Sequence, residues 1–242
     1  MFPEAGPVDC SPVTESSAAL PDAATLPAAV LWDMDGTIVD TEPYWMRAQG
    51  DLVASYGGTW THEAAMTLVG LGLERSARLL QEHGVDMEVQ PIIELLSTRV
   101  MEQITERMPW RPGALELLQE VHAAGIPMAL VTMSIGRMAR HVADRIPFPA
   151  FAVVVSADEV TESKPHPEAY LTAARQLGVD IERSVAIEDS VTGVSSAVAS
   201  GATTVGVEHL LPLDGSGAAV VWPTLAGRGL DDLSAVLGGV HA

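Results

Sequence analysis

Short apolar segments rich in β-branched residues recur along the chain, and most neighbouring segments are separated by the length of one helix. They cover residues 29–32, 128–131, 152–155, 185–187, 204–207 and 219–221. Each is short and bounded by turn residues, which is typical of strands buried on both faces of a sheet. Helical patterns lie between them at residues 112–124, 136–145, 167–177 and 191–200. This alternation predicts an α/β fold with a Rossmann-like, doubly wound parallel sheet core.

The interval between the first two apolar segments is the exception to this alternation. Residues 33–127 lie there, which is far more chain than a single crossover needs. Apolar residues in the interval repeat at helical spacing over residues 44–56, 74–83 and 92–108. We therefore expect residues 41–110 to form a small, all-helical second domain, and residues 27–40 and 111–242 to form the core. A terminal helix is expected near residues 230–237.

The charge of the chain limits its partners. Acidic residues number 32 against 13 basic ones, for a net charge of −19. Nucleic acids and anionic membranes bind basic surfaces, so neither is expected as a partner. The same charge disfavours anionic small substrates unless a local positive centre, such as a bound metal, offsets it. The sequence does not set the oligomeric state, and a monomer is the default expectation.

The first 26 residues are rich in Pro, Ala, Ser and acidic residues, and they lack the basic start and apolar stretch of a secretory signal. This composition predicts a disordered tail. Cys10 lies in the tail and is the only cysteine, so no intrachain disulfide can form, which favours a cytoplasmic location. No apolar run approaches the roughly 20 residues of a membrane-spanning helix.

Polar residues follow four of the predicted strands at the point where each strand ends. These groups are Asp33-Met34-Asp35-Gly36-Thr37, Thr132-Met133-Ser134, Ser163-Lys164-Pro165 at the end of a loop, and Glu188-Asp189-Ser190. Ligands bind at the carboxyl ends of the strands in sheets of this kind. The sequence therefore predicts a site where carboxylates, hydroxyls and a lysine meet.

The aspartates suit phosphoryl transfer. A carboxylate such as Asp33 can attack phosphorus as a covalent nucleophile. Asp35, two residues further on, can exchange a proton with the leaving oxygen. Gly36 permits a tight turn that exposes backbone amides to an anion. Several carboxylates around one point repel each other unless a hard cation lies between them, and Mg²⁺, which takes oxygen ligands, fits.

Lys164 is the only lysine of the chain, and the other 12 of the 13 Lys and Arg residues are arginines. An ammonium group is a point charge that can hold both a carboxylate and a phosphate, and an arginine fork would not reproduce its geometry. We expect Lys164 to balance the charge of the nucleophile and of the transferred group. Thr132 is expected to donate its hydroxyl to a phosphate oxygen.

With these motifs in this order, the chain resembles the haloacid dehalogenase superfamily of phosphotransferases, in the branch whose helical cap is inserted after the first motif. The resemblance covers about residues 28–207 and includes Gly193 after the last motif. It implies that Asp33 is the nucleophile and a metal ligand. It also implies that Asp35 is the acid and base, with its backbone carbonyl on the metal. Asp189 is implied as a Mg²⁺ ligand, with Glu188 close by.

The resemblance also implies a phosphate-binding set of Gly36, Thr132, Met133, Ser134 and Lys164. For three further residues a structural role is expected instead. Ser190 is expected to cap the helix that follows it, and Arg75 and Arg78 are expected to lie on a solvated face of the insert.

Several activities occur in this superfamily. The dehalogenases lack the second aspartate, so Asp35 argues against that activity, and the phosphonate hydrolases use a cap lysine that this insert lacks. A β-phosphoglucomutase-like enzyme has a cap-proximal histidine about where this chain has Trp45, and the arginine of its specificity loop has no clean counterpart in residues 70–75. The sequence therefore favours a Mg²⁺-dependent phosphomonoesterase that hydrolyses a small phosphorylated metabolite, such as a sugar phosphate, through an aspartyl-phosphate. A sugar phosphomutase is the alternative, followed by a non-catalytic binding protein on the same scaffold.

Overall fold

A six-stranded parallel sheet forms the core of the computed structural model, which describes residues 26–240. Its strands are β1 (Val30–Trp32), β2 (Met128–Val131), β3 (Val153–Val155), β4 (Val185–Glu188), β5 (Thr203–Val207) and β6 (Val220–Trp222). They are arranged in the order β3-β2-β1-β4-β5-β6, and every neighbouring pair is parallel. The predicted α/β fold is confirmed, and each predicted strand boundary lies within one residue of the observed one.

Helices cover both faces of the sheet. The helices of the core are α5 (Ala114–Ala123), α6 (Gly136–Ala143), α7 (Glu168–Leu177), α8 (Val191–Ser200) and α9 (Leu230–Val240), with short 3-10 turns at Ala157–Glu159 and Ile181–Arg183. Alternate residues of β1 point to opposite faces: Val30 and Trp32 pack in the cluster under α5, α6 and α9, whereas Leu31 packs in the cluster under α7 and α8. Burial on both faces explains why β1 is continuously apolar.

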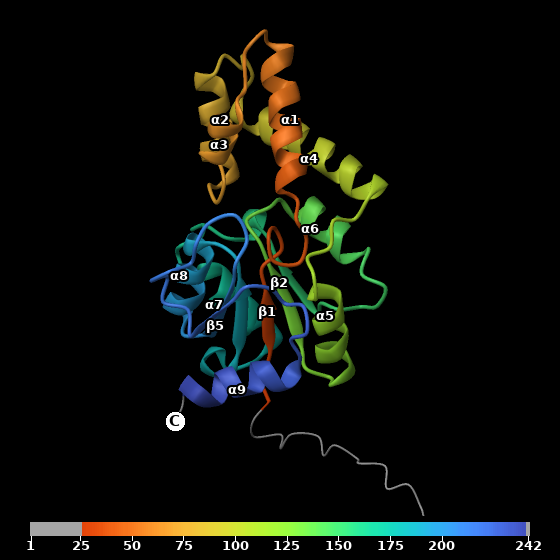
Figure 1. Cartoon of the computed structure of the whole chain (residues 1–242), viewed down its shortest axis with the longest axis vertical. Helices are drawn as coiled ribbons and strands as arrows, with labels where there is room; N and C mark the ends of the chain where they lie inside the picture. Colours follow the sequence, from red (N-terminus) through yellow and green to blue (C-terminus); the bar gives the residue numbers. More distant parts are fainter. Residues whose placement is uncertain (1–25, 241–242) are drawn as a thin grey trace, which may run out of the picture.

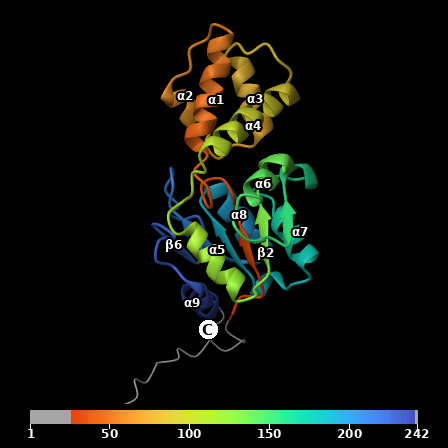
Figure 2. The same cartoon turned by 90° about the vertical axis from the view of Figure 1, so that its right-hand side faces the viewer.

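A group of helices lies at one end of the sheet, above the carboxyl ends of the strands (Figures 1 and 2). It consists of α1 (Glu42–Ser55), α2 (His62–Met66), α3 (Leu73–Glu82) and α4 (Val89–Glu106), and we call it the cap. The two connections to the core run side by side, since the amide of Asp40 donates to the carbonyl of Pro109 at 2.8 Å. The predicted boundaries at residues 41 and 110 fall in these connections, but the division into domains stays a prediction.

The cap is joined to the core by apolar packing. Leu52 of α1 and Ile92 of α4 belong to the same cluster of buried side chains as Ile38, Trp32 and Leu117 of the core. The helical insert after β1 is thus confirmed. The short helix α2 was not predicted, because its five residues are too few to show a helical period; Thr61 caps it by accepting a hydrogen bond from Ala64.

Among the described residues, no helix is both long and apolar enough to cross a membrane. Residues 1–25 lie outside the described part of the chain, and so does almost all of the predicted disordered tail, including Cys10.

Candidate active site

The predicted site residues come together where the order of the strands reverses. β1 and β4 are neighbours in the sheet, and the chain leaves β1 toward β2 on one side and β4 toward β5 on the other. Such a switch point leaves a crevice at the carboxyl ends of the two strands. Asp33 follows β1 and Asp189 follows β4, so both carboxylates lie at this crevice. A pocket of about 170 Å³ between the sheet and the cap is lined by both.

Lys164 lies at the centre of the hydrogen-bond network in the pocket. Its Nζ donates to Asp33 Oδ1 at 2.8 Å, to Glu188 Oε1 at 2.6 Å and to the carbonyl of Val131 at 2.9 Å. All three N–H groups of the ammonium are therefore used. Only 6% of the side chain is exposed. Burial by itself lowers the pKa of Lys164, but the charges of Asp33 and Glu188 outweigh it and raise the pKa above its usual value, so the group stays charged.

Three carboxylates beside this lysine could hold a cation. Asp33, Glu188 and Asp189 each place an oxygen within 4.8 Å of the others. Burial, and then the charge of Glu188, raises the pKa of Asp33 well above its usual value, although Lys164 opposes the shift. Asp33 Oδ2 is buried without a hydrogen-bond partner. The single charge of Lys164 does not balance the cluster, and a free, buried carboxylate oxygen fits a Mg²⁺ ligand.

Two glycines make room for these carboxylates. A Cβ atom at Gly36 would collide with the carboxylate of Asp189, and one at Gly193 would collide with that of Glu188. Gly36 also has a φ of 88°, a left-handed conformation that favours glycine. Its amide donates to the carbonyl of Val39 at 2.7 Å. The predicted binding of phosphate at Gly36 therefore stays a prediction, and the observed role of the residue is to let Asp189 approach.

Asp35 is held by hydroxyl groups. Thr41 donates to its Oδ1 at 2.5 Å, and Ser134 donates to its Oδ2 at 2.7 Å. The hydroxyl of Thr132 also lies within 3.4 Å of Oδ2. Thr132 and Ser134 thus contact Asp35 in this structure, and their predicted contact with phosphate is not tested by it. Thr41 was not predicted, because it stands in the connection to the cap and outside every motif.

Three more residues at the site were not predicted from the sequence. Tyr170 donates to Glu188 Oε1 at 2.7 Å from the interior of α7. The ring nitrogens of His209 lie 3.1 Å from Asp40 Oδ1 and 3.4 Å from Asp189 Oδ2. The sequence pattern around Tyr170 indicates only a buried position in a helix, and His209 lies in a loop after the last motif. No pattern in the sequence therefore indicates that either residue belongs to the site.

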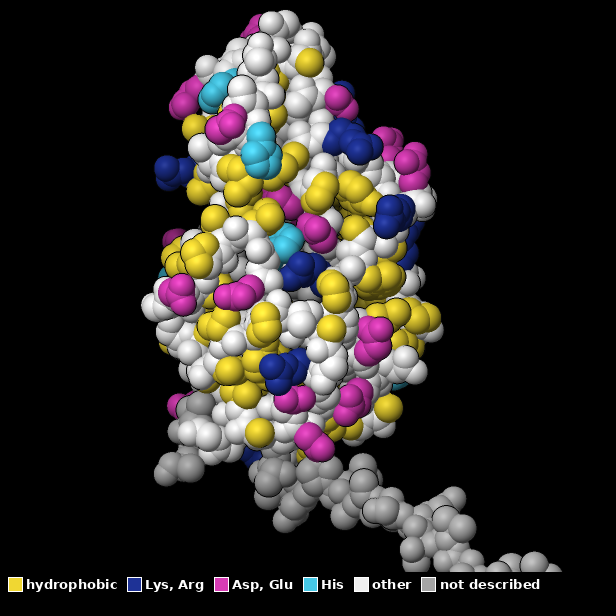
Figure 3. All heavy atoms as spheres, viewed as in Figure 1, with side chains coloured by type: hydrophobic (Ala, Val, Ile, Leu, Met, Phe, Trp, Pro, Cys, Tyr) yellow, Lys and Arg dark blue, Asp and Glu magenta, His cyan; other side chains and the backbone are white. Residues whose placement is uncertain are grey.

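Glu42, the third of these residues, lies at the first position of α1 and lines the pocket. Burial, and then the charge of Asp35, raises the pKa of Glu42 to about 7, although His209 opposes the shift. An acidic residue in the first turn of a helix is common, so no sequence pattern indicated that Glu42 lies in the site. Figure 3 shows acidic and hydrophobic side chains gathered at the junction of cap and core.

The remaining predicted residues have clear positions. Met133 lines the pocket, and its sulfur accepts from the amide of Lys164 at 3.5 Å. Ser190 caps α8 by accepting from the amide of Gly193, as predicted. Arg75 and Arg78 are exposed on α3, also as predicted. The pocket is therefore lined by the predicted catalytic and phosphate-binding residues and by Asp189, whereas Glu188 is buried beside it; the roles of all these residues stay predictions.

A doubly wound sheet with an aspartate pair after β1, a lysine-bridged acidic cluster at the switch point and a helical insert defines a class of capped α/β proteins. Residues 30–207, more than half of the chain, match the family described as haloacid dehalogenase-like hydrolase, so the chain belongs to that family.

Individual relatives fall in the same group. The phosphorylated carbohydrates phosphatase of Thermotoga maritima is 33% identical over 76% of this chain and 86% of the relative. Hexitol phosphatase B of Escherichia coli is 31% identical over 71% of this chain and 79% of the relative. The structure of CbbY from Rhodobacter sphaeroides in complex with xylulose-1,5-bisphosphate superposes with a TM-score of 0.78 at 28% identity, covering 86% of this chain and 99% of that one.

Proposed function

We propose that the protein is a Mg²⁺-dependent phosphomonoesterase that hydrolyses a small phosphorylated metabolite, such as a sugar phosphate, through a phosphorylated Asp33. The observation that carries the proposal is the state of the Asp33 carboxylate. Lys164 holds Oδ1 at 2.8 Å, and Oδ2 is buried with no hydrogen-bond partner. Lys164 thus orients the carboxylate, and no hydrogen bond to Oδ2 has to break before the carboxylate binds the metal and attacks phosphorus. The phosphatases among the relatives support the same reaction.

In the first step, an oxygen of Asp33 forms a bond to phosphorus while the bond from phosphorus to the leaving oxygen breaks. Asp35 lies two residues further on and gives the leaving oxygen a proton. In the second step, Asp35 takes a proton from water, and the water oxygen forms a bond to phosphorus. The bond between phosphorus and the Asp33 oxygen breaks, which releases phosphate and restores Asp33. The hydroxyls of Thr41 and Ser134 hold Asp35 until the substrate takes their place.

Asp33, Glu188 and Asp189 would hold the metal, which offsets the charge of the phosphoryl group and polarises it when bound. Lys164 contributes the only lysine or arginine charge among the described residues that line the pocket. The pocket, at about 170 Å³, is smaller than the roughly 300–1,000 Å³ of sites for drug-sized ligands, which favours a small metabolite.

The test is phosphate release from a panel of sugar phosphates, nucleotides and small phosphorylated acids, with Mg²⁺ and with EDTA. We expect release that needs Mg²⁺ and that is lost in Asp33→Asn, which keeps the shape of the side chain and removes the nucleophile. Asp51→Asn is the matched control, because Asp51 is exposed on α1. Activity of Asp33→Asn at a percent-level fraction of the wild type, with contamination excluded, would rule out the covalent route.

A further inference from the structure

The pocket has two chemically different ends. The core supplies the phosphate end, with Asp33, Lys164 and Asp189. The opposite side is formed by the cap, and we call the residues Glu42, Trp45, Gln49, Leu68, Ser76 and Ile93 the cap wall. A leaving group attached to a phosphate beside Asp33 extends toward this wall, because the pocket lies between sheet and cap.

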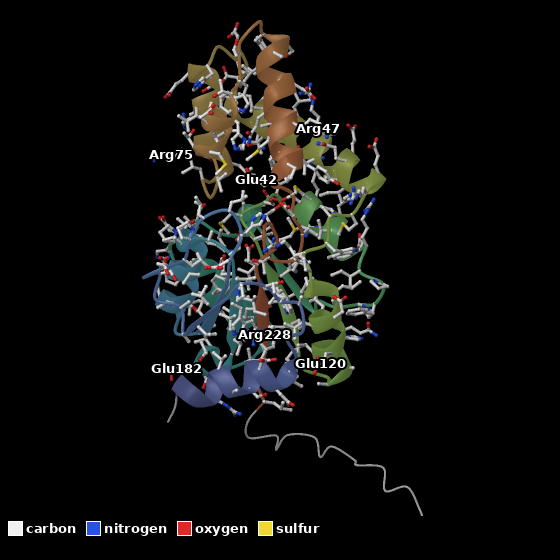
Figure 4. The ribbon with its side chains drawn as sticks, viewed as in Figure 1. Glu42, Arg47, Arg75, Glu120, Glu182 and Arg228 are labelled. Carbon is white, nitrogen blue, oxygen red and sulfur yellow. The ribbon has the colours of Figure 1, made fainter. Side chains whose placement is uncertain are left out.

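The cap wall carries no positive side chain. Among the described residues that line the pocket, Lys164 is the only lysine or arginine, and it is fully engaged at the core end. Arg47, Arg75 and Arg78 of the cap are exposed. Figure 4 places Arg47 and Arg75 on the outer sides of the cap, whereas Glu42 lies at the junction with the core. His209 also lines the pocket but lies against Asp40 and Asp189.

A second phosphate or a carboxylate on the substrate would need charge-assisted donors at this wall. The backbone amides at the start of α3 are the nearest alternative, since residues Gly72 and Leu73 line the pocket. Glu74 stands in that first turn and offsets their partial positive charge. Glu42 adds a carboxyl group on the wall itself, and a negative charge there repels an anion directly.

The polar groups that the wall does offer carry no positive charge: Gln49 and Ser76 can each donate and accept a hydrogen bond, and Glu42 supplies a carboxyl group. Gln49 is buried to 4% exposure, and its Oε1 has no hydrogen-bond partner. Glu42 is a carboxyl group and accepts hydrogen bonds with or without its proton. A hydroxyl group both donates and accepts, so the hydroxyls of a polyol can pair with this mixture of donors and acceptors. The apolar side chains of the cap wall surround these polar groups and suit the carbon skeleton of the ligand.

We propose that Glu42, together with Gln49, sets the substrate class: it binds hydroxyl groups of an uncharged polyol or sugar leaving group and excludes substrates with a second anionic group. The inference rests on the proposed function, because it assumes that the phosphate lies beside Asp33. A bisphosphate such as the one in the CbbY complex, whose protein shares the fold at 28% identity, is therefore expected to bind weakly here. It also disfavours a mutase that must hold a bisphosphate.

The test uses matched substrate pairs that differ by one anionic group: fructose 6-phosphate with fructose 1,6-bisphosphate, and glycerol 3-phosphate with 3-phosphoglycerate. Affinity is measured by calorimetry with Mg²⁺ on Asp33→Asn, which binds without turnover, and kcat/KM is measured on the active protein. In at least one pair, we expect the member without the second anionic group to be preferred on the order of tenfold, the scale of one pocket contact.

Glu42→Gln is nearly isosteric and removes the negative charge. We expect it to weaken binding of the member with one anionic group and to strengthen binding of the member with two, so that the preference falls several-fold. Glu82→Gln is the matched control: it makes the same change at an exposed position of α3 and is expected to leave the preference unchanged.

Several results would overturn the inference. These are equal or tighter binding of the anionic members, no change of preference in Glu42→Gln, and preferred binding of phosphoethanolamine, which would assign the wall to an amine. The two proposals fail separately. Selective binding on Asp33→Asn without Mg²⁺-dependent turnover of any substrate by the wild type would defeat the phosphatase and leave the specificity intact. Turnover of acetyl phosphate with equal use of both members of each pair would do the opposite.

Discussion

At the scale of single residues, the site depends on how one ammonium group is shared. Lys164 Nζ contacts three oxygens that come from the ends of β1, β2 and β4. A guanidinium is planar and donates in a fixed fork, so it does not match three acceptors grouped around one point. The position therefore requires lysine in particular, and not merely a positive charge.

We predict that Lys164→Arg lowers kcat by about 100-fold or more, which is the scale of losing one oriented electrostatic contact in an active site. The measurement is steady-state phosphate release with the best substrate of the panel. Arg175→Lys, at an exposed position of α7, is the control for exchanging the two residue types. A folded Lys164→Arg protein with near-normal kcat would show that the charge alone is sufficient.

The sequence predicted some of these residues and missed others for a physical reason. Asp33, Thr132 and Asp189 follow strands whose ends meet at one edge, so a parallel sheet brings them together once its strands are known. Thr41, Glu42 and His209 reach the site through the placement of the cap and of a loop. Those placements depend on tertiary packing, which cannot be predicted from the spacing of residues along the chain.

At the scale of elements, α8 contributes to the site through the close approach of its first turn to the end of β4. Gly193 lies in that turn, and a Cβ atom there would meet the Glu188 carboxylate. Glu188 has little freedom to move, since Lys164 and Tyr170 both hold its Oε1. The helix thus packs against the acidic cluster only because one position lacks a side chain.

We predict that Gly193→Ala lowers the free energy of unfolding by about 1–3 kcal/mol, as overpacking does, and reduces kcat/KM by at least about tenfold, because Glu188 must leave its place beside Lys164. Urea unfolding and phosphate release are the measurements. Gly238→Ala in α9 is the matched control, because nothing lies near the added methyl group. That change is expected to be neutral or to stabilise the helix by up to about 1 kcal/mol. Equal behaviour of the two variants would contradict this account.

The elements themselves were largely predictable, and the reason lies in their periods. Continuous apolar runs marked all six strands to within one residue, and Gly178 and Gly201, both left-handed in the structure, marked the ends of α7 and α8. In the cap, helices α1, α3 and α4 were predicted from apolar spacing, with starts or ends displaced by up to three residues. How the cap helices pack over the sheet did not follow from the sequence, since the apolar face of a helix does not indicate which other element it will pack against.

At the scale of the whole molecule, cap and core share one cluster of buried apolar side chains. The cap is an insert with two connections, so it could unfold by itself only by exposing the part of the cluster that the core covers. Trp45 and Trp60 lie in the cap, whereas Trp32, Trp110 and Trp222 lie in or beside the core sheet. Tryptophan fluorescence therefore reports on both parts of the molecule.

We predict that thermal unfolding occurs in a single transition, with coincident midpoints by far-ultraviolet circular dichroism and by tryptophan fluorescence. Trp45→Phe, which dims the signal from the cap, serves as the control and should change the amplitude of the fluorescence transition but not its coincidence with the dichroism. An earlier fluorescence transition that Trp45→Phe diminishes would show that the cap unfolds first.

The isolation of Lys164 has a practical consequence for chemistry done on the protein. Apart from the α-amino group, the chain presents a single primary amine to acylating or alkylating reagents, and only 6% of that side chain is exposed. Its reaction with such a reagent requires the pocket to open and the ammonium to lose a proton that two carboxylates hold in place. The fraction of molecules that carry the label at this position over time therefore reports the rate at which the pocket opens, and any ligand that keeps it closed protects the protein from the label.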